Sequence, residues 1–178
     1  MTGSPRTVLV VVRGNSGSGK SSVAAALRAA YGRGLAVVGQ DNLRRTVLRE
    51  RDLPGAAAVG LVDTVARYAL DHGFHTVVEG IMAAERYGPM LARLAAQHRG
   101  LSRLYYLDVP FAETVRRHAT RPQHAEFTPA EMAGWYHERD LLPDGLEQLI
   151  GPDSTLEATV RRMLDDTALA PPGWHPRP

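Results

Sequence analysis

Short apolar runs and longer amphipathic segments alternate along the chain. Residues 7–13, 35–38, 76–78, 104–107 and 146–150 are apolar runs, most of them rich in valine or leucine, and they predict buried strands. Helical periodicity predicts helices over residues 21–31, 42–51, 57–72, 85–98, 110–120 and 128–139, and a last helix opens at residues 154–157. This alternation predicts an α/β fold, in which helices cover both faces of a parallel sheet.

Two of the predicted helices begin with side chains that have the spacing of a helix N-cap. Thr128 and Glu131 have the spacing of a capping box, with proline at the first helical position, and Ser154 and Glu157 repeat that spacing. No internal repeat or long linker is visible, so residues 1–169 are predicted to form a single domain. Residues 170–178 are rich in proline and predict a loosely ordered tail.

The composition excludes several classes of protein. The 178 residues are 44% hydrophobic and 22% charged, which is typical of a globular chain. Cysteine is absent, which excludes disulfides, thiolate zinc sites and a cysteine nucleophile. No apolar run reaches the roughly 18 residues that span a bilayer, and no signal peptide is recognisable, so we expect a cytoplasmic protein without a membrane partner. The formal net charge of +2 disfavours a nucleic-acid partner.

The loop after the first predicted strand carries the most specific chemical signal. Residues 14–21, GNSGSGKS, match the phosphate-binding pattern G-x-x-x-x-G-K-[ST] between a strand and a helix. Lys20 is the one lysine among 21 basic residues, and it is placed to reach the β- and γ-phosphates of a nucleotide. Ser21 is placed to bind Mg²⁺. The predicted nucleotide-binding residues are Gly14, Asn15, Ser16, Gly17, Ser18, Gly19, Lys20, Ser21 and Ser22.

Acidic residues follow the second and third predicted strands, at the sheet edge where ligands bind in α/β proteins. Asp41 could accept the proton of a hydroxyl that attacks a phosphate, or it could cap the helix that follows. Arg44, one turn later, could hold a phosphate, a carboxylate or a group of hydroxyls on the acceptor. Glu79 could hold Mg²⁺ or contact the acceptor, or it could be an ordinary loop acid.

Further candidate residues lie on the later helices. Arg86 and Tyr87 begin the helix after Glu79 and could line the acceptor pocket. Arg117 and Arg121 are four residues apart, so they share a helix face if the helix continues that far, and they could cover the transferring phosphate as part of a lid at about residues 117–130. Cations near a helix C-terminus also balance the helix dipole, which is the alternative role for both arginines.

Taken together, these residues resemble the small P-loop kinases with an adenylate-kinase-like core. The resemblance rests on the order of the phosphate loop, the Asp41-x-x-Arg44 pair, the Val78-Glu79-Gly80 strand end, residues 106–110 (YLDVP) and the arginine segment. Within these kinases, the chain is similar to the branch that holds chloramphenicol phosphotransferase, the zeta toxins and the polynucleotide 5′-hydroxyl kinases.

The resemblance implies a fold, two ligands and residue roles. The fold would be a three-layer α/β/α P-loop kinase fold with a five-stranded parallel sheet in the order 2-3-1-4-5 and a short lid, and the ligands would be ATP and Mg²⁺. Residue by residue, it implies Lys20 as the phosphate-loop lysine, Asp41 as the general base, Glu79 as the strand-end acid, and Arg117 and Arg121 as lid arginines.

We therefore predict an ATP-dependent phosphotransferase that moves the γ-phosphate to a hydroxyl of a small molecule such as an antibiotic, a nucleoside or a sugar. The predicted catalytic residues are Lys20, Asp41, Arg117 and Arg121; the predicted acceptor contacts are Asp41, Arg44, Glu79, Arg86 and Tyr87; and the predicted metal ligands are Ser21 and Glu79. Two alternatives stay open: a polynucleotide 5′-hydroxyl kinase and a non-catalytic nucleotide-binding switch. The acceptor, the preference for ATP over GTP and the oligomeric state do not follow from the sequence.

Overall fold

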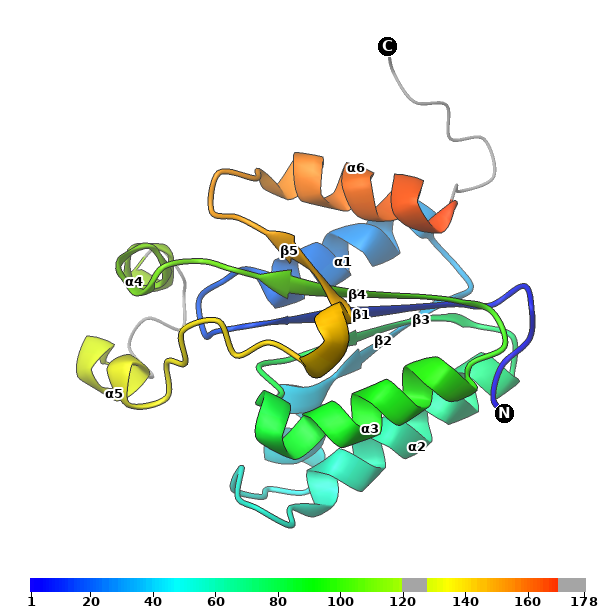
Figure 1. Cartoon of the computed structure of the whole chain (residues 1–178), viewed down its shortest axis with the longest axis horizontal. Helices are drawn as coiled ribbons and strands as arrows, with labels where there is room; N and C mark the ends of the chain where they lie inside the picture. Colours follow the sequence, from blue (N-terminus) through cyan, green and yellow to red (C-terminus); the bar gives the residue numbers. More distant parts are fainter. Residues whose placement is uncertain (120–127, 170–178) are drawn as a thin grey trace.

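A five-stranded sheet in the order β2-β3-β1-β4-β5 forms the centre of the computed structural model, which describes residues 1–119 and 128–169 (Figure 1). All four strand pairings are parallel. The predicted parallel sheet and its strand order are therefore confirmed. The strands are β1 Val8–Gly14, β2 Leu35–Gly39, β3 His75–Glu79, β4 Leu101–Leu107 and β5 Glu147–Ile150.

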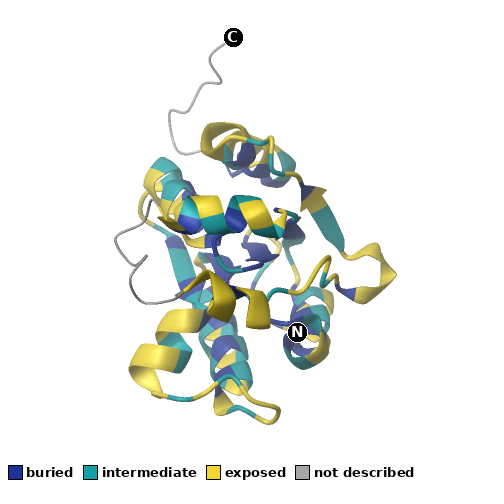
Figure 2. Cartoon of the chain, turned by 90° about the vertical axis from the view of Figure 1, so that its left-hand side faces the viewer, coloured by how far each residue is buried: buried dark blue, intermediate teal, exposed yellow. Residues whose placement is uncertain are grey.

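Helices cover both faces of this sheet. Helices α1 (Lys20–Tyr31) and α6 (Leu156–Thr167) lie on one face, and α2 (Ala57–Asp71) and α3 (Ala84–Gln97) lie on the other (Figure 1). Exposed residues lie mainly on the outer sides of the helices and on the loops (Figure 2). Among the described residues, no helix combines the length and the apolar character needed to cross a membrane.

The central strand β1 explains why its sequence is a continuous apolar run. All seven of its residues are buried. Val8, Val10 and Val12 pack into the core cluster that includes α1 and α6, whereas Leu9 and Val11 pack into the cluster that includes α2 and α3. Both faces of the strand are thus covered, and the strand ends directly in the phosphate-binding loop.

Shorter elements lie beyond the carboxyl ends of the strands. Helices α4 (Phe111–Ala119) and α5 (Pro129–Gly134) stand at that end of the sheet (Figure 1). A π-helix, η1 (Asn42–Val47), follows β2, and a 3₁₀ turn, η3 (Pro143–Gly145), precedes β5. Residues 120–127, which include most of the predicted lid, and the predicted tail at residues 170–178 lie outside the described residues.

The helix predicted over residues 42–51 is shorter than expected and of another type. The N–H of Leu48 donates to the carbonyl of Leu43, five residues back, at 3.0 Å, and Arg49 then leaves the helix with a φ of 52°. The carboxylate of Glu50 accepts from the backbone N–H groups of Ala57 and Ala58 at 2.8 and 2.9 Å. Because Glu50 caps the start of α2, the chain must turn back before a longer helix can form.

Two other helix predictions need correction. Helix α5 ends at Gly134 instead of residue 139, because the backbone of His137 is hydrogen-bonded to the side chain of Asn15. The last helix is capped by Thr155, whose hydroxyl accepts from the N–H of Ala158 at 3.1 Å, and not by the predicted capping box that starts at residue 154. The capping box at residues 128–131 is present as predicted.

Candidate active site

The phosphate-binding loop connects β1 to α1 at the carboxyl edge of the sheet. Gly14 has a φ of 143°, and a Cβ there would lie 2.8 Å from the carbonyl oxygen of Leu107. Gly17 has a φ of 80°, and a Cβ there would lie 2.6 Å from the carbonyl oxygen of Thr114. These two positions need glycine because the loop passes close to the backbone of β4 and α4.

The side chain of Lys20 lies within this loop at the first residue of α1. Its Nζ donates to the carbonyl of Asn15 at 2.8 Å and to the hydroxyl of Ser18 at 3.5 Å. The lysine is 8% exposed, so the ammonium is held among the backbone groups that would surround a phosphate. Ser16 is half-buried, whereas Ser21 and Ser22 are exposed on the first turn of α1.

Glu79 and Ser21 meet beside the loop. Glu79 ends β3, is 9% exposed and accepts a hydrogen bond from the Ser21 hydroxyl at 3.1 Å. Burial raises the pKa of Glu79 above its ordinary value, the charge of Lys20 and the bond from Ser21 oppose the rise, and the charge of Asp41 adds to it. A hydroxyl and a carboxylate oxygen are the hard donors that Mg²⁺ prefers. Within residues 1–119 and 128–169, no three acidic or imidazole side chains converge as a metal site, so Mg²⁺ here would need water and phosphate oxygens as its other ligands.

Asp41 does not cap the helix that follows it. Its carboxylate makes no capping bond in the described structure, and it accepts instead from Arg44 at 2.7 Å, with Arg45 at 3.5 Å. The Asp41 side chain is 56% exposed, and its charge acts on Glu79. Capping, the alternative role for Asp41, is therefore wrong, and the carboxylate stands at the same edge as Glu79.

Arg86 and Tyr87 lie in the first turn of α3, next to the segment that follows η1. Arg86 pairs with Asp52 at 2.8 Å. The buried hydroxyl of Tyr87 accepts from Gln40 at 3.2 Å and donates to Asp52 at 3.5 Å. The structure thus gathers Arg44, Arg86 and Tyr87 on the β2 and α3 side of the phosphate loop.

A cavity of about 570 Å³ opens on the other side of the loop. Arg117 of α4 lines this cavity and donates to the carbonyls of Ser18 at 3.2 Å and Pro152 at 3.0 Å. Its Nε donates to Glu113 at 2.7 Å, and Arg116 and Arg117 together lower the pKa of Glu113 to about 2. The cavity is lined by the phosphate loop and α1, by α4 and by the loop between β5 and α6. Arg121 lies outside the described residues.

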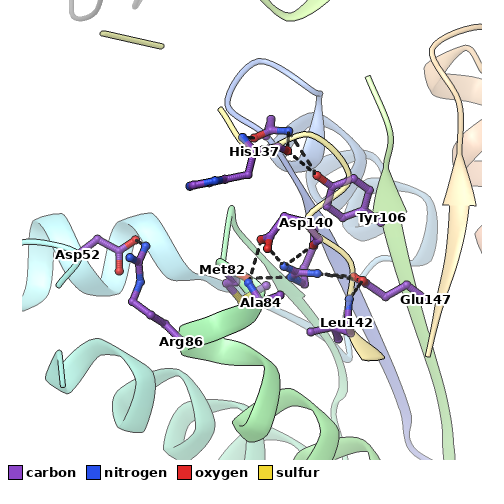
Figure 3. A network of polar contacts seen from close by, with 11 residues as sticks. Asp52, Met82, Ala84, Arg86, Tyr106, His137, Asp140, Leu142 and Glu147 are labelled. Carbon is purple, nitrogen blue, oxygen red and sulfur yellow. Dashed lines mark hydrogen bonds and ion pairs between the residues drawn. The ribbon is translucent and has the colours of Figure 1, made fainter. Parts of the chain in front are cut away.

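A buried arginine network that the sequence pattern does not predict borders the site. Arg13 of β1 is fully buried; it pairs with both carboxylate oxygens of Glu147 at 2.8 and 2.9 Å, with Asp140 at 2.9 Å, and with the carbonyl of Met82 at 2.8 Å. Asp140 also accepts from the N–H of Ala84 at 2.8 Å (Figure 3). The signal in the sequence was an arginine inside an apolar strand, which demands buried partners.

Several solved structures have folds similar to that of this chain. The APS kinase CysC of Mycobacterium tuberculosis in complex with AMPPNP and APS is 22% identical, with a TM-score of 0.66, and the match covers 91% of this chain and 98% of that one. A sugar kinase from Janibacter sp. HTCC2649 is also 22% identical, with a TM-score of 0.67 and coverage of 92% and 98%. The tunicamycin resistance protein of Deinococcus radiodurans is 15% identical, with a TM-score of 0.64 and coverage of 94% and 100%.

These likenesses establish the three-layer P-loop kinase fold. The search of curated proteins found no match. The sequence profile of AAA_33, an AAA domain, matches residues 9–139, which are most of the chain. The chain therefore belongs to the AAA_33 family of P-loop proteins.

Proposed function

We propose that this protein is an ATP-dependent phosphotransferase that moves the γ-phosphate to a hydroxyl of a small molecule. The observation that carries the proposal is the two-sided arrangement about Lys20. A cavity of about 570 Å³ lies on the α4 side of the phosphate loop, and Asp41, Arg44, Arg86 and Tyr87 lie on the β2 and α3 side. Such an arrangement provides one place for a nucleotide and another for an acceptor.

The residues of the loop and its neighbours would bind the nucleotide. The backbone N–H groups of residues 14–21 and the Lys20 ammonium would hold the phosphates. The nucleobase of ATP would enter the cavity that Arg117 helps to line. Ser21 and Glu79 would hold Mg²⁺, which neutralises charge on the phosphates when it is bound. The APS kinase CysC, which has a similar fold, was solved in complex with both AMPPNP and APS.

Asp41 would act as the general base. The acceptor hydroxyl gives its proton to the Asp41 carboxylate while its oxygen forms a bond to the γ-phosphorus; the bond from that phosphorus to the β–γ bridging oxygen breaks, and ADP leaves. Arg44 holds the Asp41 carboxylate at 2.7 Å and so fixes its orientation. Arg117 would place a cation beside the transferred group, and Arg121 keeps its predicted lid role.

The test is a panel of acceptors incubated with ATP and Mg²⁺, with transfer of the labelled γ-phosphate measured directly. The panel contains antibiotics, nucleosides, sugars and 5′-hydroxyl oligonucleotides. We expect transfer to a small molecule. In Asp41→Asn, we expect the rate of transfer to fall roughly 100-fold or more while nucleotide binding persists. Transfer only to oligonucleotides would identify a polynucleotide kinase instead, and release of inorganic phosphate alone would favour the nucleotide switch.

A further inference from the structure

Charged side chains gather around the buried hydroxyl of Tyr87 beside the proposed acceptor site. One carboxylate oxygen of Asp52 accepts a hydrogen bond from Arg86 at 2.8 Å, and the other accepts from the Tyr87 hydroxyl at 3.5 Å. Figure 3 shows Asp52 and Arg86 facing each other across the gap between their segments. Arg44 adjoins this cluster, because it donates to the carbonyl of Glu50, two residues before Asp52, at 3.1 Å and to Asp41, the residue after Gln40, at 2.7 Å.

Both arginines have an unused N–H in this arrangement. The Nε atoms of Arg44 and Arg86 are buried, and neither makes a hydrogen bond to the described residues. Among residues 1–119 and 128–169, Arg86 is bound through one terminal nitrogen, and Arg44 is bound through its two terminal nitrogens. A guanidinium binds an anion best when Nε and a terminal nitrogen donate side by side, and a buried N–H without an acceptor is costly.

Asp52 is bound in a way that allows it to leave. Its side chain is 25% exposed, and that of Arg86 is 27% exposed, so the pair lies at the rim of the site. Asp52 belongs to residues 51–56, which form no helix or strand. An incoming anion would take the place of the Asp52 carboxylate beside Arg86. Arg86 would therefore be paired with a negative group both before and after the exchange.

We propose that Arg86, Arg44 and Tyr87 form an anion-binding subsite of the acceptor pocket and that Asp52 fills this subsite when the acceptor is absent. The acceptor then carries a carboxylate or phosphate group in addition to the hydroxyl that is phosphorylated. The subsite adjoins the proposed base, because Gln40, which donates to Tyr87, directly precedes Asp41. This inference rests on the proposed function for the assignment of the acceptor side.

The test measures binding by calorimetry in protein saturated with a non-hydrolysable ATP analogue, so that the phosphate loop is filled. The probes are matched pairs that differ in one anionic group: an aldose and its aldonate for the carboxylate, and a nucleoside and its 5′-monophosphate for the phosphate. The variants are Arg86→Met, Arg86→Lys and Asp52→Asn. Arg93→Met is the control, since Arg93 is exposed on the same helix.

The anionic member of at least one pair is expected to bind roughly 10- to 100-fold more tightly than its neutral partner. Arg86→Met abolishes that preference, and Arg86→Lys restores only a part of it, because lysine keeps the charge but loses the paired donors. Asp52→Asn strengthens binding of the anion, since it removes the internal competitor, whereas a merely structural Asp52–Arg86 pair would give weaker binding. Arg93→Met retains the preference of the wild type.

The inference is overturned if no anion binds more tightly than its neutral partner, or if Asp52→Asn leaves anion binding unchanged or weaker. The proposed function is judged separately by binding of the ATP analogue and by transfer of the γ-phosphate. A neutral hydroxyl that accepts phosphate as readily as its anionic partner would leave the kinase assignment standing and remove the anion subsite.

Discussion

The side-chain amide of Asn15 makes two hydrogen bonds with the backbone of His137, its Nδ2 donating to the carbonyl at 2.7 Å and its Oδ1 accepting from the N–H at 3.0 Å. Asn15 belongs to the phosphate loop, and its own carbonyl accepts from the Lys20 ammonium at 2.8 Å. One residue therefore joins the phosphate loop to residues 135–142, which connect α5 to η3. A rearrangement of the phosphate loop around a bound phosphate would therefore be transmitted to the backbone of residues 135–142.

Replacing Asn15 by alanine is expected to loosen the backbone of His137, whose carbonyl would keep the bond from the Tyr106 hydroxyl at 3.4 Å. Loss of the two bonds should lower the free energy of unfolding by about 1–2 kcal/mol and speed hydrogen exchange at the His137 amide. Hydrogen exchange followed by mass spectrometry checks this, with Ser16→Ala as the control in the same loop. Unchanged protection of the His137 amide in Asn15→Ala would show that the contact does not hold this segment.

Arg13→Met should be among the most destabilising single substitutions in the chain. It leaves Glu147, whose side chain is 2% exposed, without its buried cation, and the expected loss is about 3–5 kcal/mol in the free energy of unfolding. Urea denaturation measures it, and the triple variant Arg13→Met, Asp140→Asn, Glu147→Gln should recover part of the loss. A loss no greater than that of Arg93→Met, at an exposed position, would mean that the network contributes little to stability.

Gly39→Ala tests the position of Glu79. The added Cβ would lie 3.1 Å from Glu79 Oε1, and Gly39 is outside the left-handed region, so the backbone tolerates alanine. The displaced carboxylate should raise the Mg²⁺ concentration needed for half-maximal turnover by roughly tenfold. Gly60→Ala, where a Cβ meets nothing within 4 Å, is the matched control. An unaltered Mg²⁺ requirement in Gly39→Ala would argue against Glu79 as a metal ligand.

The stability of the fold should decrease below neutral pH because of His75. Burial lowers the pKa of this histidine, and its Nδ1 accepts from the N–H of Val8 at 3.1 Å, so protonation at Nδ1 would break that bond. The unfolded chain then binds more protons than the native chain between the lowered pKa and the ordinary value of about 6.5, so stability rises with pH across that window and is lost as pH falls through it.

Urea denaturation at a series of pH values checks the contribution of His75. His75→Asn cannot take up the proton, so its stability should vary less with pH than that of the wild type in the acidic range. His72→Asn, at an exposed position directly after α2, is the control. Identical pH profiles for wild type and His75→Asn would assign the acid sensitivity to other groups.

The strands and the phosphate loop could be predicted because their signals are local, whereas the order of the strands in the sheet followed from the resemblance to the P-loop kinases. The loop is eight consecutive residues, and the strand-end rule correctly placed Asp41 and Glu79 at one edge. The partners of Arg13 could not be predicted, since Asp140 and Glu147 are 127 and 134 residues away along the chain. The role of Asp52 could not be predicted for the same reason, because its contact with Arg86 joins residues that are 34 positions apart.

The predicted helix ends were wrong where a tertiary contact overrode the local helix preference. Residues 135–139 have side chains that suit a helix, yet the amide of Asn15 takes the backbone of His137 and ends α5 early. In the same way, Glu50 caps α2 and shortens the helix after β2. In both cases the competing group comes from another segment, which periodicity within one segment does not reveal.

Every role proposed above depends on phosphoryl transfer from a nucleotide held by the loop around Lys20. The most direct measurement is transfer of labelled γ-phosphate from ATP to a small-molecule hydroxyl by the wild type and by Lys20→Ala, with circular dichroism to verify that both are folded. We expect transfer by the wild type and a loss of roughly 100-fold or more in Lys20→Ala. Transfer by Lys20→Ala at a rate near that of the wild type would contradict it.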